Sequence, residues 1–410
     1  MRLDPLRVTV IGQGYVGLPI SIAAAEAGFI VGGFDIDIEK INKLRQGISE
    51  LPGVNVNKII DLQKKNILQF SSEIVDHKKS TIYVIAVPTP LDRNKNPELK
   101  YLISACEMLA SIIKPGDLII NESTSFIGTL RNLIKPTIEK LSGISNIDYA
   151  VAPERIDPGN HAWEIKNTPR IISGISKEAT HRAVDFYRKF CNSVNLVTKP
   201  EVAEAAKLLE NSFRLVNIAL VNELSDILKA YNVTANEVIS AASTKPFGFM
   251  PFYPSIGVGG HCIPIDPSYL IYSATVVGLE AKIITEANRV NLSRPEKVVN
   301  LIKFELGGKL EGRLIQLAGI TYKPNIPDLR ESPALNLIRE LEKNGANIIW
   351  CDPVIQTFEG KASHPLSTDI DLGLIVTPHD SIDFAIWRKS NTRVIDLTAN
   401  SDYYGWSKYL

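Results

Sequence analysis

The chain has 410 residues, with 45 Lys and Arg balanced by 45 Asp and Glu, so its formal net charge is zero. This length predicts about two to four domains, and the zero net charge excludes the basic surplus that binding along a nucleic-acid backbone requires. A hydrophobic share of 45% without low-complexity segments is typical of a packed globular protein and excludes a disordered or fibrous one.

Two uncharged stretches, residues 8–25 and 247–265, have the length of a membrane span. Both contain glycine and proline, so we expect buried turns and loops there and no membrane segment. The first residues lack the apolar region of an export signal. The four cysteines are Cys106, Cys191, Cys262 and Cys351. They show no CxxC spacing, so we expect a cytoplasmic protein without a disulfide framework or a metal site.

The first half of the chain alternates short apolar runs with helical segments. Residues 7–28 predict a strand, a tight turn and a helix in succession. Further buried strands are predicted at 29–37, 81–90, 117–124 and 147–155. Strands that alternate with helices predict a parallel, doubly wound sheet, whose ligand crevice lies at the carboxyl ends of its strands.

The pattern changes after residue 200. Residues 201–231 contain no Gly or Pro and carry apolar side chains at three- and four-residue intervals, which predicts one long helix. Alternation then returns, with strands expected at 314–323, 346–353, 372–378 and 392–398 and a helix at 333–345. We therefore predict an α/β protein with two Rossmann-like, doubly wound domains joined by a long central helix. The predicted domain boundaries are 1–199, 200–305 and 306–410.

Gly12, Gly14 and Gly17 form a GxGxxG motif between a predicted strand and a predicted helix. In such a motif the first glycine makes the turn, the second admits a pyrophosphate to the backbone, and the third lets the helix pack on the strand. Asp35 ends the next predicted strand, where a carboxylate binds the ribose hydroxyls and favours NAD over NADP. A Gly-rich turn with a solvated Asp35 is the less favoured alternative. Lys40 is either a surface charge or a group near the adenosine end of the cofactor.

Cys262 lies in the segment GVGGHCIPIDP, between glycines that allow close backbone approach and prolines that stiffen the loop. His261 adjoins it and Asp266 follows four residues later, so Cys262 is a candidate thiolate nucleophile. For the other three cysteines we expect buried, small hydrophobic side chains.

Three polar residues of the predicted long helix, Lys207, Asn211 and Arg214, are spaced to share one face. Lys207 and Asn211, one turn apart, suit a clamp for an oxyanion. A solvated charged stripe is the alternative, and the spacing by itself does not separate the two.

Seven segments carry a resemblance to a known family. They are IGQGYVGLP, AVPTPL, NESTSFIGT, APERIDPGN, EAAKLLENSFRLVNIALVNEL, STKPFGFMPFYPSIGVGGHCIPIDP and ITYKPNIPDLRESPAL. In this order, over nearly the whole chain, the sequence resembles the UDP-glucose/GDP-mannose dehydrogenase family. APERIDPGN, KLLENSFR and GGHCIPIDP are more similar to the bacterial and archaeal enzymes that act on UDP-N-acetylhexosamines than to UDP-glucose dehydrogenases, in which the first segment reads PEFLREG.

The resemblance implies an NAD-dependent, four-electron oxidation of C6 of UDP-N-acetyl-D-glucosamine to the uronic acid, with UDP-N-acetyl-D-mannosamine as the alternative substrate. In this family a cysteine captures the intermediate aldehyde as a thiohemiacetal, which becomes a thioester that water hydrolyses. The catalytic residues implied are Cys262, Lys207, Asn211, Glu154, Asp266 and Thr124. Cys262 is then the nucleophile and Thr124 positions a water, while the base of each half-reaction stays open among Lys207, Glu154 and Asp266.

The same resemblance implies two sets of binding residues. The NAD set is Gly12, Gly14, Tyr15, Val16, Gly17, Asp35, Lys40, Thr89, Thr124 and Arg330. The substrate set is Arg155, Ile156, Lys207, Asn211, Arg214, Lys245, Tyr253, Gly259 and Lys323. Lys245 lies where family members reach the substrate of a neighbouring subunit.

Further expectations follow from the family. Residues 1–199 would bind NAD, 200–305 would form a homodimer through the central helix, and 306–410 would bind the UDP-sugar, whose product supplies surface polysaccharides. Two alternatives from other classes are a non-catalytic nucleotide-sugar or NAD-binding protein, and a two-electron hydroxyacid dehydrogenase of the 6-phosphogluconate type. The second of these needs no cysteine.

Overall fold

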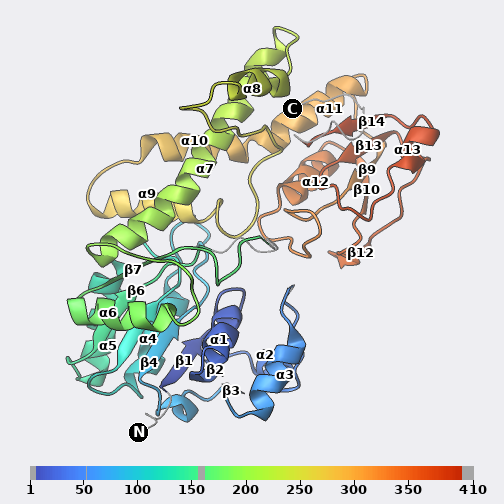
Figure 1. Ribbon diagram of the computed structural model, residues 1–410. Helices are drawn as coiled ribbons and strands as arrows, with labels where there is room; N and C mark the ends of the chain where they lie inside the picture. Colours follow the sequence, from blue (N-terminus) through green and yellow to red (C-terminus); the bar gives the residue numbers. More distant parts are fainter. Residues whose placement is uncertain (1–5, 52, 156–161, 399–410) are drawn as a thin grey trace. The chain divides into compact units, whose positions relative to one another are not determined.

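The computed structural model describes residues 6–51, 53–155 and 162–398. The chain divides into two compact units, one formed by Met1–Glu210 and Ser268–Gly278 and the other by Asn211–Pro267 and Leu279–Leu410. Each unit has its own sheet, and the long helix α7 (Pro200–Lys229) continues from the first unit into the second (Figure 1).

The first unit contains an eight-stranded sheet of order β3-β2-β1-β4-β5-β6-β7-β8. Its strands are β1 (Arg7–Ile11), β2 (Ile30–Phe34), β3 (Leu68–Ser71), β4 (Ile82–Ile85), β5 (Leu118–Asn121), β6 (Asp148–Val151), β7 (Arg170–Gly174) and β8 (Val194–Leu196). The strands from β3 to β6 are parallel, whereas β7 pairs with β6 in the antiparallel direction and β8 runs parallel to β7. No helix lies among the described residues between β6 and β7, and without a crossover helix the chain returns antiparallel.

Helices cover both faces of this sheet. They are α1 (Gly17–Glu26), α2 (Ile38–Arg45), α3 (Val56–Lys64), α4 (Lys100–Ala110), α5 (Lys135–Ser142) and α6 (Lys177–Tyr187), with a 3-10 turn η1 (Ile74–His77) and a π-helical turn η2 (Leu130–Ile134). Val8 and Val10 of β1 pack with residues of α1, α2, α3 and α6, whereas Ile11 and Tyr83 pack with residues of α4, η2 and α5. This is the doubly wound arrangement that the alternating pattern predicts.

The second unit is built around four parallel strands in the order β10-β9-β13-β14. They are β9 (Leu314–Ala318), β10 (Asn347–Cys351), β13 (Leu372–Ile375) and β14 (Val394–Asp396), and β11 (Thr357–Phe358) pairs with β12 (Lys361–Ala362) in a small hairpin. The remaining helices of this unit are α8 (Ala235–Ser243), α10 (Lys282–Leu292), α11 (Arg294–Glu305), α12 (Pro333–Lys343) and α13 (Ala385–Lys389), whereas α9 (Asp266–Val276) belongs to the first unit from Ser268 on. Residues of α11 and α12 share one core with β9 and β10, and Trp387 of α13 packs in a second core with Ala318 and Ile375.

The predicted fold class is confirmed: two α/β domains with parallel strands are joined by a long helix, expected at 201–231 and found at Pro200–Lys229. The sheet of the first unit departs from the prediction at both edges, because β3, β7 and β8 were not among the predicted strands and β7 and β8 reverse direction. The division into three domains stays a prediction. In the described part of the chain, no helix is both long and apolar enough to cross a membrane.

Candidate active site

The loop between β1 and α1 requires glycine for two different reasons. Gly12 has a φ of 91°, and a Cβ there would lie 2.4 Å from the carbonyl oxygen of Ala86, while a Cβ on Gly17 would lie 1.8 Å from the carbonyl oxygen of Gly12. A Cβ on Gly14, in contrast, would meet no atom within 4 Å. The fold therefore needs Gly12 and Gly17, whereas Gly14 leaves an opening before the N-terminus of α1, the kind of space a pyrophosphate occupies.

Asp35 follows β2 and is nearly buried, with both carboxylate oxygens bonded. Its Oδ2 accepts hydrogen bonds from the backbone N–H of Gln13, at 2.9 Å, and from Lys40 Nζ, at 2.8 Å. Its Oδ1 accepts from the backbone N–H of Asp37, at 3.0 Å. The carboxylate is thus fixed beside the glycine loop, as an adenosine-ribose ligand requires, and the ammonium of Lys40 is paired with it. These residues fit NAD.

The other residues expected to contact NAD are distributed between the units. Tyr15 and Val16 are partly buried, and Val16 directly precedes α1. The carbonyl oxygen of Thr89 accepts a hydrogen bond from the hydroxyl of Tyr269, at 3.1 Å. Thr124 is partly buried after β5.

Arg330 belongs to the second unit. Its Nε and Nη2 donate to both carboxylate oxygens of Asp328, and Nη2 lies 3.3 Å from Nδ1 of His261. Asp328 therefore holds the guanidinium beside the residue that precedes Cys262.

Glu154 and Lys207, both expected to be catalytic, meet in the first unit. Lys207 Nζ donates to the carbonyl oxygen of Glu154 at 2.7 Å, and both side chains are more than nine-tenths buried. The Glu154 carboxylate accepts from the backbone N–H of Arg155, at 2.6 Å, and from Nη2 of Arg170, at 3.2 Å. Glu154 is therefore fixed at its carbonyl group and at both carboxylate oxygens.

Arg155 was expected to bind substrate, and its guanidinium has partners within the first unit. Its Nη2 and Nε donate to Glu210 at 2.6 and 3.1 Å, and its Nη1 donates to the carbonyl oxygen of Pro169 at 2.9 Å. The sequence reasoning did not identify Glu210. Ile156, predicted to bind substrate, lies outside the described residues.

Cys262, Asp266 and Asn211 come together in the second unit. The carbonyl oxygen of Cys262 accepts from the backbone N–H of Asp266 at 2.8 Å, in the turn that begins α9. Asn211 Nδ2, on α7, donates to Asp266 Oδ2 at 2.7 Å. Asp266 is 1% exposed and Cys262 is partly buried. The turn therefore contains Cys262 and Asp266, and the amide of Asn211 on α7 donates to the Asp266 carboxylate; a thiol, a carboxylate and an amide donor are the groups that covalent catalysis on a carbonyl uses.

The residues around Gly259 form a crowded loop in the second unit. A Cβ on Gly259 would lie 2.8 Å from Tyr322 and 2.9 Å from Pro333, so the backbone passes directly against these side chains. Lys323 follows Tyr322, is partly buried, and its carbonyl oxygen accepts from Thr321 Oγ1 at 3.0 Å.

Three predicted substrate residues of the second unit are exposed. Arg214 lies on α7. Lys245 places its Nζ 4.9 Å from the centre of the Phe247 ring, and Tyr253 is 41% exposed. The described contacts do not join any of the three to Cys262 or Lys323.

A buried Asp–His pair, which the sequence reasoning missed, supports the loop that contains Lys323. Asp352 follows β10 and accepts from the backbone N–H of Ile320, at 2.8 Å, with Nε2 of His379 3.1 Å from the same oxygen. The backbone N–H of Asn325 donates to Nδ1 of His379 at 2.9 Å. Asp352 lies at the end of one predicted strand and His379 directly follows another, and this was the available signal for a polar cluster at the carboxyl edge of the sheet.

A second missed cluster surrounds Glu154. Arg170, in β7, is 1% exposed and donates from Nη1 to Glu122 at 2.5 Å and from Nη2 to Glu154 at 3.2 Å. The Tyr187 hydroxyl also donates to Glu122. Burial raises the pKa of Glu122 to about 7, against the opposing charge of Arg170. The available signal was a charged residue at the start of the short, mostly apolar segment RIISG.

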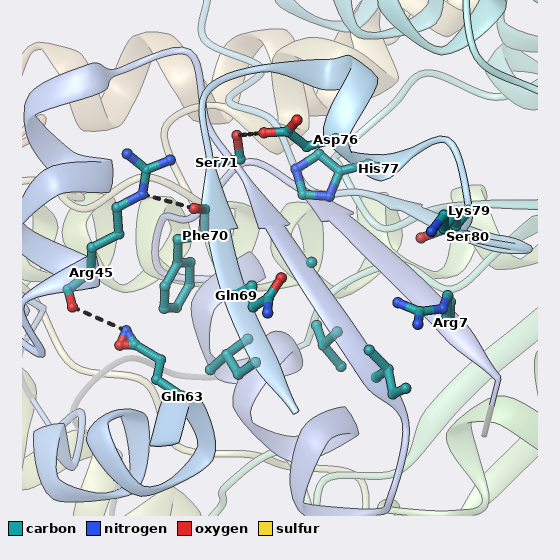
Figure 2. A pocket seen from close by; sticks show the side chains of 14 residues that line it. Arg7, Arg45, Gln63, Gln69, Phe70, Ser71, Asp76, His77, Lys79 and Ser80 are labelled. Carbon is teal, nitrogen blue, oxygen red and sulfur yellow. Dashed lines mark hydrogen bonds between the residues drawn. The ribbon is translucent and has the colours of Figure 1, made fainter. Parts of the chain in front are cut away.

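A cavity of about 620 Å³ lies over β1, β2 and β3 of the first unit (Figure 2). Arg7, Arg45, His77 and Lys79 are among the residues that line it, and none of the predicted site residues does. This cavity is therefore separate from the glycine loop and from Glu154.

Three domain models of one protein family match most of the chain. Residues 6–191 match the NAD binding domain of the UDP-glucose/GDP-mannose dehydrogenase family. Residues 201–293 match its central domain, and residues 316–400 match its UDP binding domain.

Individual relatives act on two epimeric substrates. A UDP-N-acetyl-D-glucosamine 6-dehydrogenase of Pseudomonas aeruginosa is 36% identical over 86% of this chain and 83% of the relative. A UDP-N-acetyl-D-mannosamine dehydrogenase of Methanococcus maripaludis is 34% identical over 92% of this chain and 87% of the relative. The structure of a UDP-D-ManNAc dehydrogenase from Pyrococcus horikoshii is similar with a TM-score of 0.89 at 30% identity, covering 98% of both chains.

Proposed function

The chain belongs to the UDP-glucose/GDP-mannose dehydrogenase family and is an NAD-dependent UDP-sugar 6-dehydrogenase, and we propose that its substrate is UDP-N-acetyl-D-glucosamine. The reaction converts the C6 alcohol, two NAD and one water into a carboxylate, two NADH and three protons. The observation that carries the covalent mechanism is the turn in which Cys262 and Asp266 are held together and Asn211 donates to Asp266.

Cys262 retains the intermediate on the protein. Its thiolate adds to the C6 aldehyde and forms a C–S bond, which gives a thiohemiacetal. Loss of a hydride from C6 converts this adduct to a thioester, and water attack breaks the C–S bond and releases the acid. NAD, when bound, accepts the hydride in each half-reaction. A covalent adduct keeps the reactive aldehyde from escaping between the two steps.

Residues of each unit are the proposed donors and proton acceptors. Asn211 and Lys207 lie one turn apart on α7, where an amide N–H and an ammonium stabilise the oxygen that becomes negative when the carbonyl is attacked. Glu154 and Asp266, both buried and hydrogen-bonded, serve as proton acceptors for the alcohol and for the attacking water.

The stoichiometry of the reaction tests this proposal. Purified protein is supplied with one UDP-sugar and NAD, and NADH and the sugar product are counted. Two NADH per sugar with an acid product support the four-electron mechanism. One NADH per sugar would indicate a two-electron dehydrogenase, and binding without NADH formation would indicate a nucleotide-sugar-binding protein.

The C2 epimer of the substrate is the second point to test. Relatives named for each epimer match this chain at similar identity, so UDP-N-acetyl-D-mannosamine is the alternative. We expect kcat/KM to be higher for the gluco epimer. A higher kcat/KM for the manno epimer would reverse the substrate assignment and leave the mechanism unchanged.

The role of Cys262 is tested with a matched pair of variants. Cys262→Ser should abolish acid formation and leave NAD binding unchanged, because serine lacks a comparably nucleophilic anion at neutral pH. Cys351→Ser, in β10 of the same unit, should keep wild-type turnover. Acid formation at the normal rate by Cys262→Ser would refute the covalent mechanism.

We also propose a homodimer through α7. Phe213, Leu220 and Ile227 recur every seven residues along this helix and are 45%, 62% and 52% exposed, which is a face suited to another helix. Leu220→Glu should lower the mass measured by light scattering to that of a monomer. An unchanged dimer would place the interface elsewhere.

We further propose that the protein works in the cytoplasm, where its product enters polysaccharide biosynthesis. None of the four cysteines, all within the described residues, forms a disulfide, which supports a reducing compartment.

A further inference from the structure

The loop that contains Cys262 is held in place by side chains of other elements. Residues 249–265 of the second unit form no helix or strand, and α9 begins only at Asp266. In such a segment, buried main-chain groups need hydrogen-bond partners from elsewhere in the fold. Ser255, seven positions before Cys262, has such partners for both its N–H and its carbonyl group.

Asn222 of α7 and Arg294 of α11 hold the main chain of Ser255. The backbone N–H of Ser255 donates to Asn222 Oδ1 at 2.8 Å, and its carbonyl oxygen accepts from Arg294 Nε at 3.2 Å. Arg294 Nη1 also donates to Asp226 Oδ1, at 2.6 Å, and to the carbonyl oxygen of Asn222, at 3.4 Å. Asn222 is 0% and Arg294 1% exposed. One buried guanidinium thus joins α7, α11 and the loop.

From Ser255 the loop continues directly to the site residues. Ile256 is buried in the core that α11 and α12 share with β9, and Ile263 is buried against α7 and α10. Gly259 and Cys262 lie between these two apolar anchors. Because apolar contacts are not directional, the hydrogen bonds at Ser255 determine how the main chain enters this segment.

Asp226 does not depend on Arg294 for its counter-charge. Lys297 Nζ donates to Asp226 Oδ2 at 2.7 Å, and Lys229 Nζ lies 3.9 Å from Asp226 Oδ1. Arg294 Nη2, in contrast, is buried and has no hydrogen-bond partner among the described residues. Removal of the guanidinium therefore leaves Asp226 paired and also removes an unsatisfied buried donor. Since a buried ion pair is weak evidence for a stabilising role, a positioning role fits these contacts better.

We infer that Arg294 is a positioning residue, whose guanidinium fixes the main chain at Ser255 and so places Cys262 to capture the C6 aldehyde before it leaves the site. This inference rests on the proposed function for the role of Cys262. A misplacement of about 1 Å lowers the rate of an enzymatic step by up to about a hundredfold. When capture slows, more of the aldehyde escapes into solution.

The fate of the aldehyde separates positioning from stability. The protein is supplied with UDP-sugar and NAD, and the reaction is quenched at early times with borodeuteride. This reagent reduces released aldehyde to C6-deuterated UDP-sugar, which mass spectrometry counts beside the acid. Arg294→Met should raise the ratio of released aldehyde to acid by about tenfold or more. Unfolded protein forms neither product, so a loss of folded protein alone leaves the ratio unchanged.

Two further variants complete the comparison. Lys297→Met removes a cation from Asp226 but leaves the donor and acceptor at Ser255 in place, so it should keep the wild-type ratio. Arg294→Lys keeps a cation beside Asp226 but cannot reproduce the several donors of a guanidinium, so it should fold even if Arg294→Met does not, and its ratio should also rise. A wild-type ratio in the folded Arg294 variants would overturn the inference.

Hydrogen exchange tests the same role without turnover. In the ligand-free protein, amide exchange across residues 250–262 should be about tenfold faster or more in Arg294→Met, while exchange of β9 stays as in the wild type. If the wild type forms no NADH from either UDP-sugar, the proposed function fails, while this comparison still reports whether Arg294 fixes the loop. Wild-type exchange of the loop, or equal acceleration of the loop and β9, would show that it does not.

Discussion

Replacement of Gly14 by alanine tests whether the glycine loop is shaped by the fold or by a ligand. The backbone of Gly14 does not have a positive φ, and an added Cβ would meet no atom within 4 Å. Gly14→Ala should therefore fold normally and gain up to about 1 kcal/mol, because alanine restricts the unfolded chain. Nothing among the described residues requires glycine at this position.

The same substitution should weaken NAD binding. If Gly14 admits the pyrophosphate, a methyl group there displaces the phosphates from the backbone N–H groups at the start of α1. A hydrogen bond to a charged group contributes about 1.5 to 3 kcal/mol. Loss of one such bond corresponds to a Kd that is about ten- to a hundredfold higher.

Gly17→Ala provides the matched contrast. Its Cβ would lie 1.8 Å from the carbonyl oxygen of Gly12, so the backbone must move and thermal stability should fall by several degrees without any ligand. Isothermal titration calorimetry with NAD and thermal unfolding of the ligand-free protein measure both effects. Wild-type NAD affinity in Gly14→Ala, or a loss of stability as large as that of Gly17→Ala, would refute the reasoning.

Three further substitutions give separate outcomes. Asp266→Asn removes a proposed proton acceptor, so acid formation should slow by about a hundredfold or more, and loss of the anionic partner of Asn211 should lower the unfolding free energy by about 1.5 to 3 kcal/mol; a normal steady-state rate would argue against Asp266 as a proton acceptor. Burial raises the pKa of Glu204 to about 7, above its unfolded value, so this group stabilises the fold at low pH and loses that contribution as pH rises toward 8. Glu204→Gln should therefore flatten the decline in unfolding free energy between pH 5 and 8 by at most about 3 kcal/mol. The same decline with pH in the wild type and in Glu204→Gln, measured by denaturant titration, would contradict this. Asp352→Asn replaces one buried acceptor oxygen by an N–H donor and removes the charge beside His379, so it should lower the unfolding free energy by about 2 to 4 kcal/mol, whereas a loss below about 0.5 kcal/mol would show that the pair is dispensable.

Patterns along the chain predicted the fold and the chemistry in outline. The strand, turn and helix around Gly12 and Gly17, and the long helix at Pro200–Lys229, follow from spacings of a few residues. The order of motifs over the chain identified the family. These features are local, so side-chain periodicity and backbone requirements are sufficient to predict them.

The partners of the site residues depend on the tertiary structure. Arg170 meets Glu122 across 48 positions of sequence, and Asn211 meets Asp266 across 55. Such pairs form only when strand order and helix packing bring distant segments together, and the reversal of β7, which contains Arg170, was itself not predicted.

The sequence by itself thus determined the two α/β domains, the glycine loop and the identity of Cys262 as the candidate nucleophile, because each depends on residues close together in the chain. Only the tertiary structure decided that Glu154 shares a buried guanidinium with Glu122 and that the backbone N–H of Gln13 donates to Asp35. Charges buried in a poorly solvating interior need specific partners, and the folded chain determines which partners are near.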